Sequence, residues 1–343
     1  MHALGVQFRG LVDTVRMGRV PARTLAIADS RSLVRSMFLA SAAQIDLLPY
    51  LRGGRPFSAI VDHTGCTRPD RLRAWLWIGS ELGELSRRGE VFGVRGRRSQ
   101  ALADGDRLLT AHYRSMLEYQ VGPYGSLDQL LRSDAGEGRS DLSQYADDIA
   151  QVSLAAAPFV SSFVRQAVAE VHPENVLDVG CGTGVYTRVV LDADAHARVE
   201  GIDLAENVIE AARHELDRAG YGSRVGFHVG DVRRWTPESA RRFDLVMLLN
   251  NVYYFDQHKR AALYRDMGEL LTERGQLLIV SMLAPGSVAA AHLHFMLTCQ
   301  AAPSSLPGRA EIESDLRSAG FRIVANEVLV PTEPFIGLRA TRY

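Results

Sequence analysis

The segment LDVGCGTG, residues 177–184, sets Gly180, Gly182 and Gly184 at alternate positions after an apolar run that contains Asp178. Glycine carries no Cβ, so a backbone built from it can turn tightly and approach a ligand closely. A helix is expected to begin directly after the glycines, and the free N–H groups of its first turn favour a polar ligand group. The segment therefore predicts a bare backbone cradle for a ligand at the end of a strand.

Polar side chains also end the next three predicted strands. Asp203 lies at the end of RVEGIDL, Asp231 ends RVGFHVGD, and Asn250 ends FDLVMLLN, where Asn251 follows. Strands that are apolar throughout and separated by helices predict a parallel sheet covered on both faces. Ligands of such sheets bind beyond the carboxyl ends of the strands. We therefore expect Asp203 to accept the two hydroxyls of a ribose and Asp231 to accept an exocyclic amine.

The glycine spacing argues against a nicotinamide dinucleotide. That fingerprint requires its third glycine three positions after the second, which here is Val185. Instead, the ordered motifs LDVGCGTG, GIDLA, GDV and FDLVMLLNNVYYF make residues 150–343 resemble the class I S-adenosylmethionine-dependent methyltransferases. Four motifs in order are far more specific than one glycine motif.

The resemblance implies a fold, a cofactor and a set of contacts. The fold is α/β, a Rossmann-like, seven-stranded, doubly wound sheet whose final antiparallel hairpin is FRIVANEVLVP and FIGLRATRY. The cofactor is S-adenosylmethionine, with its methionine end at the glycines, its ribose at Asp203 and its adenine at Asp231. SQYADDIAQVS resembles the family helix that closes on the cofactor. The predicted cofactor residues are Tyr145, Asp178, Gly180, Gly182, Gly184, Asp203, Leu204, Asp231, Val232 and Asn250.

The layout of the whole chain resembles the small-molecule O-methyltransferases, which implies methylation of a natural product or metabolite. Oxygen is the favoured acceptor atom, with nitrogen and carbon left open. Methyl transfer from a sulfonium is a direct displacement, so alignment of the reactants matters most, and a base is required only for a protonated nucleophile. The family's small-molecule members often carry a His-Asp-Trp pattern after the fourth strand. Here the pattern is NVYYF, with Tyr253 or Tyr254 in place of the histidine.

Two histidines in VAAAHLHFMLTCQAAP are the remaining candidate bases. If this segment is helical, His292 shares a face with Phe295, Met296 and Cys299, whereas His294 points about 200° away from His292. Packing in a pocket wall or at the surface is the alternative for both histidines. No metal is predicted, because a His-x-His pair converges on one ion only from a strand. The predicted catalytic residues are His292, His294 and Tyr254.

Aromatic residues are expected to surround the acceptor, because aromatic faces suit both a sulfonium and a flat substrate. Ordinary packing between domains is the alternative for the tyrosines near the linker. The predicted substrate residues are Tyr113, Tyr119, Tyr124, Tyr253, Tyr254, His292 and Phe295.

Three regions are predicted along the chain. Residues 1–110 carry helical periodicities, including SLVRSMFLASAAQIDLLPYL, and a hairpin that turns at Arg88-Gly89, which favours a winged-helix-like domain for dimerisation and substrate capping. Residues 111–150 form an aromatic-rich linker and cap, with the boundary in the glycine- and serine-rich stretch 132–144. Residues 151–343 form the cofactor domain.

Composition supports a folded chain of two domains, with 343 residues of which 46% are hydrophobic and 23% charged. The net charge of −1 hides an asymmetry, because residues 1–110 hold 17 arginines against 10 acidic residues. The arginines near the hairpin keep a second function open, a DNA-binding regulator with the cofactor domain as a sensor. These arginines are Arg87, Arg88, Arg95, Arg97 and Arg98.

The preceding helix argues against that second function. It carries Trp75, Leu76, Trp77 and Ile78 in succession, so we expect it to be buried, at a dimer interface if not inside the chain, whereas a groove-reading helix needs an exposed polar face. NNVYYF also lacks the Asn-Pro-Pro-aromatic motif of the base-methylating relatives. Scattered arginines at the start and the absence of a long uncharged apolar stretch predict a cytoplasmic protein without membrane contact. The three cysteines are expected to be structural thiols.

Overall fold

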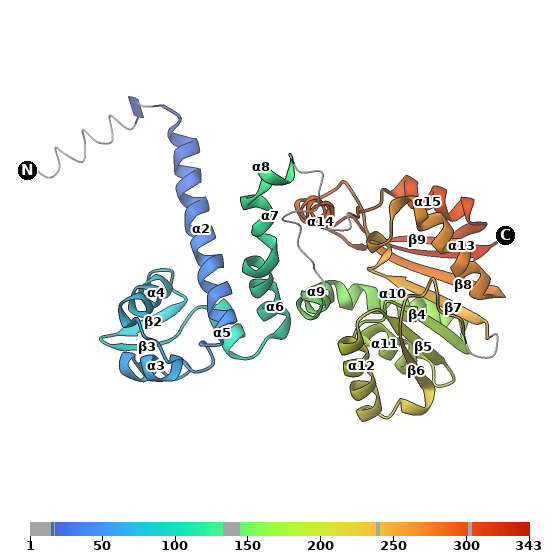
Figure 1. Cartoon of the computed structure of the whole chain (residues 1–343), viewed down its shortest axis with the longest axis horizontal. Coiled ribbons are helices and arrows are strands. Elements are labelled where there is room, and N and C mark those ends of the chain that lie inside the picture. Colours follow the sequence, from blue (N-terminus) through green and yellow to red (C-terminus); the bar gives the residue numbers. More distant parts are fainter. Residues whose placement is uncertain (1–14, 17, 133–144, 238–240, 301–303) are drawn as a thin grey trace, which may run out of the picture. The chain divides into compact units, whose positions relative to one another are not determined.

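The computed structural model describes residues 15–16, 18–132, 145–237, 241–300 and 304–343 (Figure 1). The chain divides into two units, Met1–Val121 and Gly122–Tyr343. The division falls before the predicted boundary at 132–144, most of which lies outside the described residues. The predicted linker begins at residue 111, yet helix α6, Arg107–Ser115, runs across that position and packs against helix α2 of the first unit.

The first unit is mainly helical. Its elements are α2 (Val20–Gln44), β1 (Arg55–Pro56), α3 (Phe57–Thr64), α4 (Pro69–Glu81), β2 (Leu85–Arg88), β3 (Val91–Val94), α5 (Arg97–Ala103), α6 (Arg107–Ser115) and η1 (Met116–Gln120). The three strands form an antiparallel sheet in the order β1-β3-β2. The predicted hairpin is confirmed, with the turn one residue later than expected, at Gly89 and Glu90.

Helix α4 buries one face and exposes the other. Leu72, Leu76 and Gly79 face the core of the first unit. A Cβ at Gly79 would lie 2.3 Å from Phe38, so the helix sits too close to α2 for any larger residue. Trp77 and Ile78 are 45% and 40% exposed. The expected burial of these two residues is therefore wrong within the chain, because only one stripe of a helix can face one core.

The second unit alternates strands and helices. Its elements before the fourth parallel strand are α7 (Gly122–Gly125), α8 (Leu127–Leu130), α9 (Ala146–Ser153), η3 (Leu154–Ala156), α10 (Ala157–Val171), β4 (Asn175–Val179), α11 (Val185–Ala193), β5 (Arg198–Asp203), α12 (Glu206–Arg218), η4 (Gly222–Arg224) and β6 (Val225–Val229). They continue with β7 (Phe243–Leu249), η6 (Val252–Tyr254), η7 (Gln257–Lys259), α13 (Arg260–Leu270), β8 (Leu271–Met282), α14 (Val288–Thr298), α15 (Arg309–Ser318), β9 (Phe321–Val330) and β10 (Phe335–Arg342).

The seven strands form one sheet in the order β6-β5-β4-β7-β8-β10-β9. Strands β4 to β8 pair in parallel, and β10 runs antiparallel to both β8 and β9. The predicted seven-stranded sheet with a final antiparallel hairpin is confirmed. The strand order reverses between β4 and β7, and this switch point is where ligands of doubly wound sheets bind.

Helices cover both faces of the sheet (Figure 1). Helices α10, α11 and α12 pack on one face, around Phe163, Val190 and Ile209, and helices α13 and α15 pack on the other, around Leu263 and Leu316. Within the described residues, one helical segment, Gln151–Val171, is long and apolar enough to cross a membrane. Its buried side chains, including that of Phe163, belong to the core of this unit.

Candidate functional site

The glycine segment forms an open turn between β4 and α11. Gly180, Gly182 and Gly184 have φ angles of 65°, 53° and 77°, in the left-handed region that favours glycine. A Cβ at Gly180 would lie 2.6 Å from Asn251 Nδ2, whereas a Cβ at Gly182 would meet nothing within 4 Å. The turn is therefore closed toward the end of β7 and open at Gly182, as a cradle for a ligand requires.

Asp203, at the end of β5, holds this turn in place. Its Oδ2 accepts a hydrogen bond from Gly182 N at 2.9 Å, and its Oδ1 accepts one from Ala205 N at 3.0 Å. Each carboxylate oxygen can accept a second hydrogen bond. The half-buried side chain of Asp203 can thus support the turn and accept two ligand hydroxyls together, whereas its neighbour Leu204 is largely exposed.

Asp178, also predicted to contact the cofactor, is buried and bonded to helix α11. The side chain is 1% exposed, and Thr187 Oγ1 of α11 donates to its Oδ2 at 2.6 Å. Burial raises the pKa of Asp178 to about 7, the Thr187 hydrogen bond lowers it in part, and the charge of Asp203 adds to the rise. Asp178 ties β4 to α11. Thr187 was missed from the sequence because a lone threonine in a helix carries no signal.

Asp231, after β6, is paired with an arginine two residues on. Arg233 Nε lies 2.9 Å from Asp231 Oδ1 and Arg233 Nη2 lies 2.6 Å from Oδ2, and this pairing holds the pKa of Asp231 below its usual range. The guanidinium carbon also lies 5.7 Å from the centre of the Phe255 ring. A carboxylate that pairs with one guanidinium keeps further lone pairs, so Asp231 can still accept a hydrogen bond from an amine. Its neighbour Val232 is buried.

The end of β7 leaves buried acceptors without partners. Asn250 has a φ of 58°, and its backbone N–H donates to Val280 O at 2.8 Å. Asn251 Nδ2 donates to Val179 O of β4. Among the described residues, Asn250 Oδ1, Asn251 Oδ1 and the hydroxyl of Tyr186 are buried and make no hydrogen bond. Buried polar atoms are nearly always paired, so these oxygens suit donors on a ligand.

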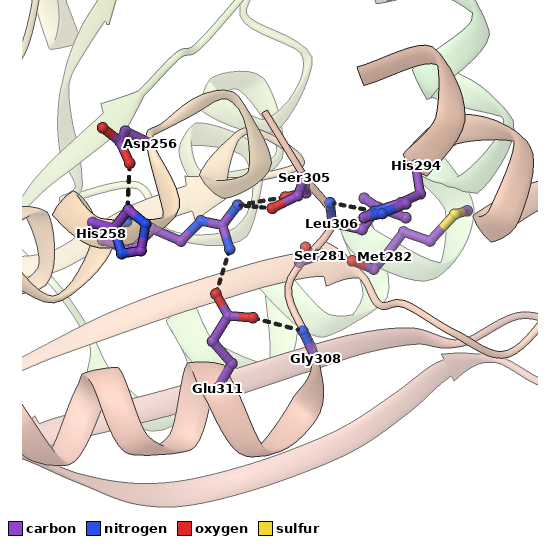
Figure 2. Close-up of polar contacts among 10 residues, drawn as sticks. Asp256, His258, Ser281, Met282, His294, Ser305, Leu306, Gly308 and Glu311 are labelled. Carbon is purple, nitrogen blue, oxygen red and sulfur yellow. Dashed lines mark hydrogen bonds and ion pairs between the residues drawn. The ribbon is translucent and has the colours of Figure 1, made fainter. Parts of the chain in front are cut away.

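A second group of predicted residues meets at helix α14, which is helical as expected. Tyr124 Oη lies 2.7 Å from His292 Nδ1, their rings are stacked with centroids 5.7 Å apart, and the Tyr124 ring lies 5.0 Å from that of Phe295. Burial lowers the pKa of His292. His294 points elsewhere, and its Nδ1 accepts a hydrogen bond from Leu306 N at 3.2 Å (Figure 2). His292 and His294 therefore have separate partners within the chain.

The other predicted aromatic residues are spread over the chain. The rings of Tyr253 and Tyr254 are 4.8 Å apart after β7, with Tyr253 buried and Tyr254 exposed, and burial raises the pKa of Tyr253 well above its usual value. Tyr145 precedes α9. Tyr113 and Tyr119 are buried in the first unit, where Tyr113 belongs to the core, so packing inside that unit accounts for both rings.

The described residues contain no group of three or more His, Cys, Asp or Glu side chains that could hold a metal ion. A hollow of about 660 Å³ lies along α13, bordered by Trp235, Arg242, Asp266 and Arg342. Its lining includes none of the glycines or carboxylates described above. Val232 and Arg233, next to Asp231, do border it.

The residues at the strand ends fit S-adenosylmethionine. An open glycine turn, a carboxylate beyond β5, another beyond β6 and orphaned oxygens beyond β7 match its amino-acid part, its ribose and its adenine. The sheet order is that of the class I methyltransferase fold, which the sequence motifs predict, and the strand-end residues agree with it. Residues 176–275 match the family model described as "Methyltransferase domain".

The chain is also similar to individual proteins. It is 27% identical to the malonyl-[acyl-carrier protein] O-methyltransferase 1 of Ilyobacter polytropus over 38% of this chain and 45% of that protein. Its fold is similar to that of the mitomycin 7-O-methyltransferase MmcR, with a TM-score of 0.78, 16% identity and coverage of 95% and 99% of the two chains. It is also similar to human N-acetylserotonin methyltransferase, with a TM-score of 0.71, 16% identity and coverage of 95% and 98%. The chain spans less than half the length of that first curated relative.

Proposed function

We propose that the protein transfers a methyl group from S-adenosylmethionine to a small-molecule acceptor, a natural product or secondary metabolite. The observation that carries this proposal is the meeting of the open glycine turn, Asp203 and the orphaned asparagine oxygens at one switch point of a class I sheet. The names of two solved structures similar over nearly the whole chain, a mitomycin 7-O-methyltransferase and an N-acetylserotonin methyltransferase, support a small acceptor.

The cofactor would be held by hydrogen-bond acceptors at both of its ends. Asp203 would accept from the ribose hydroxyls and Asp231 from the adenine amine, while the backbone at Gly180 and Gly182 lies against the methionine part. Asn250 Oδ1 and Asn251 Oδ1 are buried acceptors for its ammonium. When bound, the cofactor supplies a methyl group on a sulfonium, a carbon already activated for displacement. The chain then has to align the acceptor and exclude water.

His292 is the stronger of the two candidate bases. When Nδ1–H of His292 donates to the Tyr124 oxygen, the ring is held in place and Nε2 is the unprotonated nitrogen that can take a proton. The lowered pKa of His292 keeps the ring neutral near pH 7, the form that can take a proton from a hydroxyl. This arrangement favours an acceptor oxygen that carries a proton, such as a phenol. Methylation at nitrogen or carbon stays open.

The first unit would form a homodimer. Leu25, Ile27 and Leu33 on α2 are each more than half exposed, and the exposed face of α4 adds Trp77 and Ile78. Exposed apolar residues in this number favour a protein interface. Two of the arginines that kept DNA binding open make contacts within the unit, because Arg87 lies over the Trp77 ring and Arg98 pairs with the buried Glu84. The winged-helix-like name for this unit and a cytoplasmic location stay predictions.

Transfer of isotope-labelled methyl to a panel of phenolic and hydroxylated small molecules tests the activity. We expect label in at least one oxygen methyl ether, and no transfer to any member of the panel would count against the proposal. His292→Ala should lose turnover and keep cofactor affinity, because the histidine lies on the acceptor side. The exposed His258, in η7 after β7, provides a control, and His258→Ala should keep both turnover and cofactor affinity.

A further inference from the structure

Arg260, the first residue of α13, carries a charge with no access to water. Its side chain is 0% exposed. Burying a guanidinium costs free energy unless partners replace the lost hydration. Arg260 Nη1 lies 2.8 Å from Glu311 Oε1, and Nη2 donates to the main-chain oxygen of Ser305 (Figure 2). A carboxylate and a main-chain oxygen therefore replace the water that this guanidinium loses.

The partners of Arg260 lie in the described residues just before α15 and in its first turn. Ser305 precedes α15, and Glu311 in its first turn also accepts a hydrogen bond from Gly308 N at 3.2 Å (Figure 2). Arg260 itself begins α13. One buried charge thus couples the start of α13 to the segment 304–308.

That segment in turn sets the chemistry of His294. Leu306 is the residue after Ser305, and its N–H donates to His294 Nδ1 at 3.2 Å. A backbone N–H can only donate, so Nδ1 must be an unprotonated acceptor. A neutral imidazole then carries its proton on Nε2. The Nε2 atom of His294 is then a hydrogen-bond donor and not a base.

We propose that Arg260 is a positioning residue for His294. It holds the segment 304–308 so that Leu306 fixes His294 as the Nε2–H tautomer, in which Nε2 is a hydrogen-bond donor. The tautomer and its dependence on Arg260 are properties of the chain alone, and only a part for His294 in methyl transfer rests on the proposed function. Of the two histidines, His292 then remains the candidate base.

Nitrogen-15 spectra of the histidine-labelled full chain at pH 8 report the tautomer of each ring, and the spectrum of His294→Gln identifies the His294 signals. In the wild type we expect His294 to show the pattern of a protonated Nε2 and an unprotonated Nδ1. In Arg260→Met we expect that pattern to give way to exchange between both tautomers, because the segment 304–308 loses its anchor. Arg260→Lys, with a charge but no fork, should retain part of the pattern.

The matched control is Arg339, another buried arginine, which pairs with Glu170 on the α10 side of the sheet. Arg339→Met also removes a buried charge, yet it should leave the His294 signals unchanged. A protonated Nδ1 in the wild type would overturn the proposal even if Arg260→Met does not fold. An unchanged His294 pattern in a folded Arg260→Met protein would overturn it as well. Cofactor binding measured on the same samples tests the proposed function separately.

Discussion

Asp203 has two roles in the site, support of the glycine turn and the predicted contact with a ribose. We expect Asp203→Asn to weaken S-adenosylmethionine binding by about 1–3 kcal/mol, roughly 5- to 150-fold in Kd, because the amide offers one acceptor where two are needed. Calorimetric titration measures the change. Asp244 is the control, since its Oδ2 also accepts two backbone N–H groups, at the opposite ends of the strands. Equal losses in Asp203→Asn and Asp244→Asn would contradict the ribose assignment.

Gly182 faces the open side of the turn. Gly182→Ala should block the cofactor, because the new methyl group points into the space where a Cβ meets no neighbour. Part of any loss comes from the left-handed φ of 53°, which costs a non-glycine residue about 1–2 kcal/mol. Gly220, with a φ of 85° and open surroundings after α12, carries the same cost away from the site. Cofactor affinity should fall in Gly182→Ala and persist in Gly220→Ala. Unchanged affinity in Gly182→Ala with a loss in Gly220→Ala would contradict the assignment of Gly182 to the cofactor site.

The buried Asp178 predicts a pH dependence of stability. Its pKa is about 7 in the folded chain and about 3.9 when unfolded, so between these values the folded state binds more protons than the unfolded state. The contribution of Asp178 to the free energy of unfolding therefore falls as pH rises from about 4 to 7. Relative to the wild type, Asp178→Asn should gain stability between pH 5 and pH 8 in urea unfolding. A difference that does not change with pH would refute this explanation.

The sequence placed the predicted cofactor residues at the strand ends, but it did not indicate the contacts that support them. Asp203 and the glycines sit at strand ends, where position in the fold follows from the order of elements. Thr187 and Arg260 act through partners 9 and 51 residues away, and no local pattern specifies such pairs. Tyr113 was predicted to contact substrate because aromatic residues suit binding sites, but the same ring also suits a core, and in the first unit it is buried in one.

Helix α10 packs on strand β10 through a glycine. A Cβ at Gly337 would lie 2.5 Å from the Phe163 ring, so the helix and strand approach too closely for a side chain there. Gly337→Ala should lower the free energy of unfolding by about 1–3 kcal/mol through overpacking. Phe163→Leu should recover part of that loss in the double variant, although it costs stability by itself. Urea unfolding of the four proteins measures both effects, and additive losses would contradict the packing argument.

Element types were predicted well and their limits less well. The strand expected in QLLIVSM begins five residues earlier, at Leu271, because Leu271 already pairs with Phe243 of β7, ahead of a register shift after which Gln276 pairs with Leu245. Helix α2 begins at Val20, well before the periodic stretch that indicated it. Its first half is exposed within the chain, so its apolar residues do not form a stripe toward any core of the described residues and gave no periodic signal.

The chain as a whole is expected to be a dimer through its first unit. Leu25→Glu combined with Ile27→Glu should convert the protein to a monomer in sedimentation experiments, because both side chains are among the most exposed apolar residues of α2. Val328 on the edge strand β9 is exposed to a similar degree, and Val328→Glu should leave the dimer intact. A wild-type protein that sediments as a monomer would contradict the proposed interface.

The division of the chain could not be predicted to the residue from composition. Glycine- and serine-rich residues at 132–144 indicated a boundary, whereas the first unit ends at Val121, because α6 and η1 pack against α2. Packing partners far apart in sequence decided the division. The predicted start of the cofactor domain, residue 151, lies inside the second unit, which begins at Gly122.

Calorimetric titration of the purified full chain with S-adenosylmethionine tests the central claim most directly, which is that the glycine turn and the carboxylates beyond β5 and β6 form one cofactor site. We expect one equivalent of cofactor to bind in the wild type, with binding lost in Gly182→Ala and weakened in Asp203→Asn. A folded wild-type chain that releases no heat of binding at millimolar cofactor would contradict the account.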